Sequence, residues 1–264
     1  MGNNTVRTKT DPNYYRVRQT GFKIYPALKK RFADNTGSFA LGPVLEISDI
    51  ESTSSRYITS DNTGLSHDTF KTKYYSGAKF LFDFNNVDNF FAPHTGIRFQ
   101  TDANWTANLK EDKNFTSINS QFTFYKSLDV QENFVLASQV GSGLNFGKGY
   151  EFFDMPTIGG QKGIRGYRTE RFYGKSTLWH NTDLRVKFGS SYNPTLPFTF
   201  GCFASFDYGR VWLANDKSEN WHYSYGGGIY FTPIDMLIFS LGAYIPKERL
   251  EESPRITLRL GFEF

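Results

Sequence analysis

The chain has 264 residues and a formal net charge of +4, and charged residues make up 21% of it. Its mean hydropathy is -0.48, and no stretch approaches about eighteen consecutive apolar residues, which excludes a transmembrane helix. Positive charges are spread along the chain rather than gathered in a block, so a nucleic-acid partner is not expected, and the single cysteine, Cys202, excludes an internal disulfide framework.

The chain also offers little for metal or cofactor binding. Its four histidines, His67, His94, His180 and His222, show no metal-ligand spacing. We therefore expect no metal, nucleotide or organic cofactor. The first residues, Met1–Asn4, are polar from the start and show no signal peptide, so an exported protein would be represented here by its mature sequence.

The dominant pattern along the chain is alternation of apolar and polar residues with period two, which predicts β-strands. It is clearest near the C-terminus, where every even position from Ile256 to Phe264 is apolar and the odd positions are Arg, Thr, Arg, Gly and Glu. Only a strand, not a helix, sorts such residues onto two faces. The sequence therefore predicts an all-β protein.

Eleven strands are predicted, and a twelfth is expected within residues 3–18, where Pro12 breaks the pattern. Short turns alternate with longer polar loops, an arrangement typical of outer-membrane barrels. The predicted strands span residues 20–32, 37–49, 70–85, 95–109, 115–128, 132–146, 177–190, 197–212, 221–232, 235–246 and 254–264.

Two folds fit this pattern: a soluble sandwich or lipocalin-type barrel with apolar residues inside, and a membrane barrel with apolar residues outside. Charged residues such as Arg98, Asp102 and Asp183 fall in the middle of polar strand faces, while the other faces repeat phenylalanine. Strands of about nine to eleven such residues cross a bilayer when tilted. We predict one domain over residues 1–264, a transmembrane antiparallel β-barrel of about twelve strands.

Residues 147–176 show no strand pattern and form a long predicted loop that holds the sequence Ile164-Arg165-Gly166-Tyr167. Loops of this length inside a compact domain are uncommon and are usually functional or disordered. This one is rich in Phe, Tyr, Ile and Arg, so we expect an ordered extracellular loop that folds into the barrel lumen.

The two strands after the loop each place one carboxylate, Asp183 or Asp207, on the polar face. Neighbouring strands lie about 4.8 Å apart, so both carboxylates can flank one guanidinium. We expect Arg165 to pair with them, because an arginine buried alone would be costly. Gly166 would let the backbone turn sharply or approach the wall, and Tyr167 would wedge the tip of the loop.

These residues also resemble a known family. The sequences IGGQKGIRGY at 158–167, NTDLR at 181–185 and FASFDYGRVW at 203–212 are similar to the loop and strand motifs of the BamA/TamA/FhaC superfamily of outer-membrane assembly and secretion barrels. Asp183 replaces the usual Glu of that motif. The motif residues outside the predicted contact are Gly159, Gly160, Gly163, Ile164, Arg185, Gly209 and Trp212.

The resemblance implies further features. Phe262 and Phe264, in the strand 254–264, resemble the family's C-terminal insertion signal. Typical members carry POTRA domains before sixteen strands, and this sequence shows neither. Five predicted strands follow the loop, as in the family, so the missing strands would lie on the N-terminal side. The first and last strands would either close a narrow ring or pair with a second copy as a homodimer, since lipid tolerates no unpaired edge.

The resemblance implies a barrel in the bacterial outer membrane that helps client outer-membrane proteins to insert or translocate. Three alternatives stay open: a small pore gated by loop 147–176, an enzyme, and the anchoring barrel of a larger protein. No Ser, His and Asp cluster in a motif such as G-x-S-x-G, so no catalytic residue is predicted. The contact of Arg165 would either gate the lumen or only anchor the loop.

Overall fold

The computed structural model describes residues 13–54, 56–60, 63, 65, 67–160, 163–191, 197–213, 218–233, 237–247, 254–262 and 264. Apart from short 3-10 turns at Tyr57–Thr59 (η1), His67–Phe70 (η3) and Phe152–Asp154 (η4), the assigned elements are strands. Among the described residues, no helix is long and apolar enough to cross a membrane.

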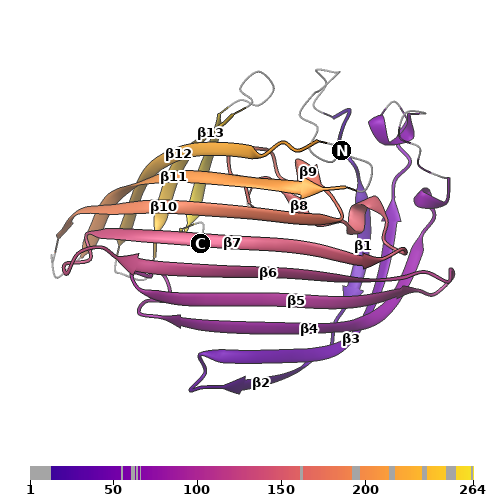
Figure 1. Ribbon diagram of the computed structural model, residues 1–264, viewed down its shortest axis with the longest axis horizontal. Coiled ribbons are helices and arrows are strands. Elements are labelled where there is room, and N and C mark those ends of the chain that lie inside the picture. The colour runs from indigo at the N-terminus through magenta and orange to yellow at the C-terminus, as the bar shows by residue number, and fades with distance from the viewer. Residues whose placement is uncertain are drawn as a thin grey trace.

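One antiparallel sheet of twelve strands forms the wall, with neighbours along the chain paired in order (Figure 1). Ten of these strands have the alternation that the sequence predicts, and their bounds agree within a few residues except at the C-terminal end of β14. They are β3 (Gly37–Ile50), β4 (Lys73–Val87), β5 (Gly96–Asn108), β6 (Asn114–Ser127), β7 (Phe134–Gly147), β10 (Ser176–Ser191), β11 (Phe198–Trp212), β12 (His222–Pro233), β13 (Phe239–Pro246) and β14 (Arg255–Leu260).

The predicted strand at 20–32 is two strands, β1 (Gln19–Ile24) and β2 (Leu28–Phe32), which pair with opposite ends of β3. Proline has no N–H for the ladder, so the chain is interrupted at Pro26. The backbone of Pro26 lies where a Cβ on Gly42 would be, so this glycine makes room for the interruption. Because this segment forms two strands instead of one, the sheet has twelve strands.

The twelfth strand of the sheet is not the one that the sequence predicts within residues 3–18. Residues 13–18 form a turn and irregular chain, and the rest of that prediction lies outside the described residues.

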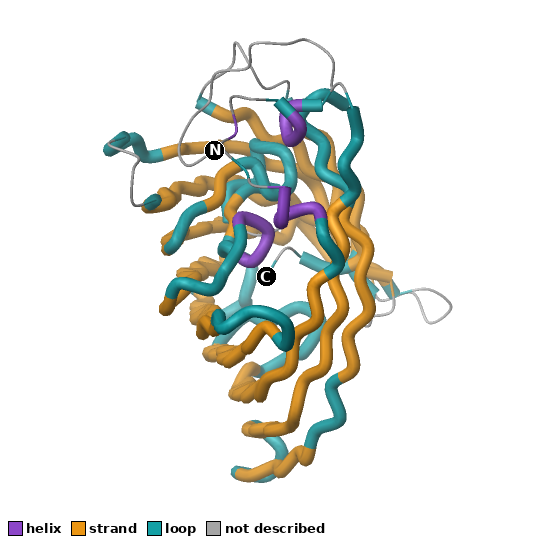
Figure 2. The backbone as a smooth tube through the Cα atoms, turned by 90° about the vertical axis from the view of Figure 1, so that its right-hand side faces the viewer, coloured by secondary structure: helices purple, strands orange, loops and turns teal. Residues whose placement is uncertain are grey.

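The sheet curves strongly, so that it has a convex outer face and a concave inner face (Figure 2). Large apolar side chains are exposed on the outer face, whereas polar and charged side chains are buried on the inner face. A soluble sandwich or lipocalin-type barrel would require the opposite arrangement, with apolar side chains on the inner face and polar side chains on the outer face. Outer-face examples are Phe80, Trp105, Phe122, Leu184, Phe200, Ile229, Leu241 and Leu258.

The segment between β7 and β10 lies inside the curve of the sheet and is better ordered than a strandless loop. It contains the turn η4 and a small hairpin, β8 (Thr157–Ile158) paired with β9 (Phe172–Tyr173). Strands of two residues are too short to give an alternation pattern, which is why the sequence predicts none here.

The sheet has two edges, β1 with β2 on one side and β14 on the other, and no ladder joins them within the described residues. The prediction of a strand over 254–264 is wrong at its end, because β14 stops at Leu260. Gly261 takes a φ of +101°, which turns the chain out of the ladder. Phe262 and Phe264 consequently leave the outer apolar face and lie on the inner side of the sheet, near Arg185.

Candidate functional site: a buried arginine between two carboxylates

Two carboxylates from neighbouring strands face the inside of the barrel wall. Asp183 lies in β10 opposite Ser205, and Asp207 lies in β11 opposite Asn181. The exposed fractions of Asp183 and Asp207 are 1% and 0%. Alternation places both side chains inward, and antiparallel pairing brings them within reach of one group, as expected from the sequence.

Arg165, at the tip of the loop, lies between these carboxylates with an exposed fraction of 2%. Its Nε donates to Asp207 Oδ2 at 3.0 Å and its Nη2 to Asp207 Oδ1 at 2.5 Å. Towards Asp183, Nη1 donates to Oδ2 at 3.2 Å, and Nη2 lies 2.8 Å from Oδ1. The planar fork of arginine donors makes this double engagement possible.

The backbone of the loop tip is bound to the same wall. The Arg165 N–H donates to Asp207 Oδ2 at 3.0 Å, and the Gly166 N–H donates to Ser224 Oγ at 3.2 Å. Ser224 in turn donates to Asp207 Oδ2 at 3.0 Å, and Ser205 donates to Asp183 Oδ1 at 2.7 Å. The two carboxylates therefore receive hydrogen bonds from the loop and from two strands, β11 and β12.

Arg165 balances only one of the two negative charges. Arg185, two residues after Asp183 on the same face of β10, brings the second positive charge and is also buried, at 3% exposure. Burial would lower the pKa of the Arg165 guanidinium, but Asp183 and Asp207 outweigh it and raise that pKa well above its ordinary value. The group of two arginines and two aspartates is neutral overall, which reduces the cost of burying each charge.

Aromatic rings complete the surroundings of the arginines. The Cζ atom of Arg165 lies 4.9 Å from the ring centroid of Tyr244 and 5.4 Å from that of Phe264. The Cζ atom of Arg185 lies 3.8 Å from the ring centroid of Phe262. Such cation–π contacts are worth about 2 kcal/mol each when desolvated.

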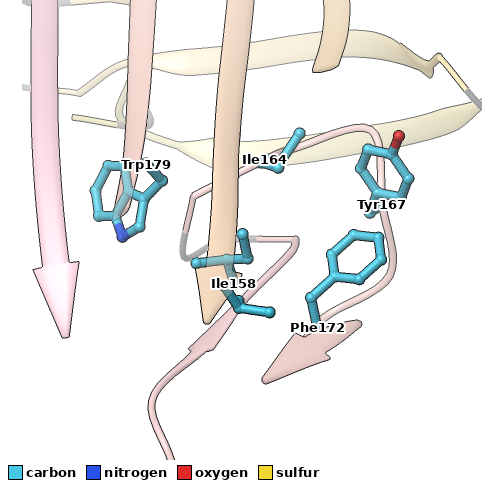
Figure 3. Close-up of a cluster of buried hydrophobic side chains, with 6 residues drawn as sticks. Ile158, Ile164, Tyr167, Phe172 and Trp179 are labelled. Atoms are coloured by element: carbon cyan, nitrogen blue, oxygen red, sulfur yellow. The ribbon is translucent and has the colours of Figure 1, made fainter. Parts of the chain in front are cut away.

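Beside these charges, the loop forms a small apolar core against the wall (Figure 3). Tyr167 contacts Phe172 edge-on at a centroid distance of 5.1 Å, and Phe172 stacks on His222 of β12 at 3.7 Å. Tyr167 thus packs the tip of the loop, as its position in the motif predicts. The cluster consists of Ile158, Ile164, Tyr167, Phe172, Trp179 and Val211.

The motif glycines serve two different needs. Gly159, Gly160 and Gly163 have φ values of +125°, +65° and +94°, a backbone conformation that other residues rarely adopt. Gly166 does not have a positive φ; a Cβ there would lie 2.6 Å from Ser224 Cβ and 3.0 Å from the Pro246 nitrogen. Of the two roles expected for Gly166, the structure shows close approach to the wall.

The remaining motif residues are divided between the site and the outer surface. Gly209 lies opposite Trp179, where a Cβ would be 2.9 Å from that of Trp179. Trp212, by contrast, is 37% exposed, contacts the Trp221 ring edge-on and lies under the Arg210 guanidinium, whose Cζ is 5.1 Å from its ring centroid. Arg168 is exposed in the loop.

Several residues of the site were not singled out by the sequence: Ser205, Ser224, Tyr244, His222 and Asn181. Asn181 Nδ2 donates to the Gly163 carbonyl oxygen at 2.6 Å, and its place in NTDLR was an available signal. Ser205 could have been found by alternation from Asp207. Ser224 and Tyr244 belong to strands whose register the sequence does not reveal.

The loop leaves part of the lumen open. A cavity of about 770 Å³ lies between the loop and the walls of β5, β6 and β7, and Asp102, Asn119 and Gln121 also line a second cavity of about 360 Å³. The lining of the larger cavity is mainly amide, hydroxyl and carboxylate groups, among them Asn119, Ser142 and Asp154. This space is polar, as expected for a barrel lumen.

One group in the described part of the chain has metal-ligating side chains close together. Asp88, His94 and Glu132 lie in the turns after β4 and β6, with ligand atoms within 4.8 Å of one another. Asp88 already accepts hydrogen bonds from the His94 N–H, His94 Nδ1 and the Thr95 N–H, each at 2.9 Å. These bonds hold Asp88 and His94 together in the turn, and Glu132 Oε2 lies 3.6 Å from His94 Nδ1.

The chain matches one protein family in sequence and two solved proteins in fold. Residues 2–264 match the family model described as the Omp85 superfamily domain. The fold is similar to that of BamA from Haemophilus ducreyi lacking POTRA domains 1-3, with 14% identity and a TM-score of 0.71 over 96% of this chain and 56% of that one. It is also similar to CdiB from Escherichia coli, with 14% identity and a TM-score of 0.56 over 94% and 46%.

The chain spans about half the length of these two solved proteins. No curated protein sequence matches it significantly. The family resemblance drawn from the loop and strand motifs is confirmed by the match across the chain, and the wall is an outer-membrane β-barrel of that kind. The chain belongs to the Omp85 superfamily.

Proposed function

We propose that this chain assists the insertion or translocation of other outer-membrane proteins, with the edge strands of its sheet as the working surface. The observation that supports this most is that no ladder between the described residues joins the two edges, β1 with β2 and β14, beside a loop that is tightly bound to the wall. Unpaired N–H and C=O groups at an edge are a template for pairing with another strand.

The short edge strands fit the same role. β1 and β14 have six residues each, whereas β4 and β11 have fifteen. A strand needs about nine to eleven residues to cross the hydrocarbon layer when tilted. The bilayer next to these edges would be thinned, which would lower the barrier for a client strand.

Within this proposal, the contact of Arg165 with Asp183 and Asp207 holds the loop against β10 and β11 while the edges act. The motif resemblance to BamA/TamA/FhaC proteins supports this assignment.

The test uses the purified protein in liposomes and a urea-unfolded outer-membrane barrel as client. We expect the client to fold faster than in empty liposomes, as measured by protease protection over time. Liposomes with the exposed loop variant Lys148→Ala should match the unchanged protein. Equal client folding with and without the protein would contradict the proposal.

A second function, passive permeation, is favoured by the polar cavity of about 770 Å³ beside the loop. Planar-bilayer recording separates the two. A steady conductance that rises when Arg165→Ala releases the loop, with no effect on client folding, would support a gated pore instead of an assembly role.

A further inference from the structure

The two edges of the sheet carry charge of the same sign on their inner face. In β14, Arg255 lies opposite Tyr244 and Arg259 lies opposite Ser240 of β13. The Tyr244 ring contacts Arg165 inside the lumen, and this fixes the inner face of both strands. Thr257, between the two arginines, is the third inner position of β14.

The other edge repeats this arrangement. In β2, Lys29 lies opposite the buried Ala40, and Arg31 lies opposite Ser38. Lys29 also lines the cavity of about 360 Å³, which places it on the lumen side. In β1, Lys23 is the inner charge.

Lys23 is already paired across the ladder. It lies opposite Glu46 of β3, and its Nζ is 2.6 Å from Glu46 Oε2. This pair shows how a carboxylate on a neighbouring strand can neutralise an inner cation of an edge strand.

The inner rows of the described edge strands contain five cations and no carboxylate, although the whole chain has 26 acidic and 30 basic residues. The outer rows are mainly apolar, with Phe22, Ile24, Leu28 and Phe32 on one edge and Ile256, Leu258 and Leu260 on the other. Each edge therefore offers backbone pairing, an apolar outer row and a cationic inner row.

We propose that these edges select a polypeptide β-strand with carboxylates at its inner positions and apolar residues at its outer positions. Oppositely charged residues directly across a ladder stabilise the pairing, and like charges destabilise it. The inference rests on the proposed function, because it assumes that an edge receives a strand. A second copy of this chain would place cations opposite cations, so it is a poor partner.

The simpler explanation is that edge cations only prevent unwanted pairing, as lysines at sheet edges commonly do. The two explanations differ in their consequences. A general deterrent gives no advantage to an acidic strand over a neutral one, whereas a selecting edge does.

The test compares three fluorescent peptides of about nine residues, in which apolar residues alternate with Glu, Gln or Arg. Their affinity for the protein in zwitterionic micelles is measured by fluorescence anisotropy at low salt. We expect the Glu peptide to bind about tenfold more tightly than the Gln peptide, and the Arg peptide to bind most weakly. High salt should reduce these differences by screening.

Two charge-reversed double variants identify which edge binds the peptide. They are Arg255→Glu with Arg259→Glu, and Lys29→Glu with Arg31→Glu. At the edge that receives the peptide, reversal should invert the order so that the Arg peptide binds best. The matched control is Lys126→Glu with Lys187→Glu, which makes the same change in net charge on the central strands β6 and β10, away from both edges. This control should keep the preference for the Glu peptide.

Disulfide trapping separates failure of the charge rule from failure of the proposed function. Cys202 is replaced by Ser, and Thr20→Cys or Thr257→Cys is introduced opposite a peptide cysteine. If the peptides are trapped but the Glu and Gln forms bind equally, charge selection is wrong while strand capture stands. If no peptide is trapped at either edge, the proposed function also fails.

Anionic lipid is the remaining alternative for a cationic row. Micelles doped with phosphatidylglycerol should leave the Glu peptide bound, because the inner rows face the lumen rather than the lipid headgroups. Complete displacement of the peptide by this lipid would overturn the proposal.

Discussion

Arg185 in β10 donates a hydrogen bond from Nη2 to the backbone oxygen of Phe264, at 2.5 Å. This contact joins the middle of the wall to the segment that follows the edge strand β14. The Phe262 ring covers the same guanidinium, and Phe264 also faces Arg165. The end of β14 and the anchor of the loop are therefore connected through two buried arginines.

The variant Phe262→Ala tests this connection. We expect it to lower the free energy of unfolding by about 2 kcal/mol, because a desolvated cation–π contact with Arg185 is lost. The measurement is urea unfolding of protein refolded in detergent, which avoids any effect of the C-terminus on insertion in cells. In the Arg185→Met background the same substitution should have a much smaller effect, and equal effects in both backgrounds would contradict the contact.

Arg165→Ala should release the loop from the wall. The substitution leaves Asp183 and Asp207 buried without their partner, and breaking a buried ion pair in this way costs about 3–5 kcal/mol. We expect rapid trypsin cleavage after Arg168 in the variant, with the strands still resistant. Lys148→Ala, an exposed charge of the same loop, should leave cleavage unchanged. Equal cleavage rates for both variants would show that Arg165 does not anchor the loop.

Gly166→Ala tests close approach rather than charge. The new Cβ would lie 2.6 Å from Ser224 Cβ, so the tip must move away from the wall. We expect a loss of about 1–3 kcal/mol in the free energy of unfolding, typical of overpacking. Gly189→Ala is the matched control, since its Cβ would meet only the Phe200 ring at 3.5 Å. A loss as large in the control as in Gly166→Ala would argue against this account.

We expect the anchoring of η4 to depend on pH through Asp154 in the loop. Burial raises the pKa of Asp154 to about 7, Glu46 and Glu151 add to the rise, and Lys73 opposes it. A raised carboxyl pKa means that the folded state holds a proton that the unfolded state has released. Stability is therefore fully present below the unfolded pKa of about 3.9 and falls as pH rises to about 7.

The measurement for Asp154 is the melting temperature in detergent from pH 4 to 9, compared with Asp154→Asn. The amide mimics the protonated carboxyl, so the variant should lack this part of the decline. Parallel pH profiles for the two proteins would show that Asp154 does not contribute.

Leu184→Arg tests the inside-out sorting of the wall. Leu184 lies in the middle of β10 on the outer face, one residue after Asp183. An arginine on the lipid face near the bilayer midplane costs about 2–4 kcal/mol. We expect this loss for protein folded into liposomes, and Leu184→Phe should fold normally. If the arginine is tolerated, the outer face of β10 is not in contact with lipid.

The sequence determined the strands and the members of the central contact. Alternation with period two depends only on neighbouring residues, so it located the long strands within a few positions. The same alternation showed that Asp183 and Asp207 share a face, and the motif around Arg165 marked the loop. Where a single residue interrupts a strand, as at Pro26 and Gly261, the pattern continued across the break and the prediction was too long.

Only the tertiary structure decided which other groups neutralise and surround the contact of Arg165 with Asp183 and Asp207. Arg165 meets Asp207 across 42 positions, and Arg185 meets Phe264 across 79. Ser224 and Tyr244 enter the site from strands whose register depends on the curvature of the whole sheet. Local periodicity carries no information about such distances, because the path of the loop and the stagger of the strands set them only when the sheet has curved around its lumen.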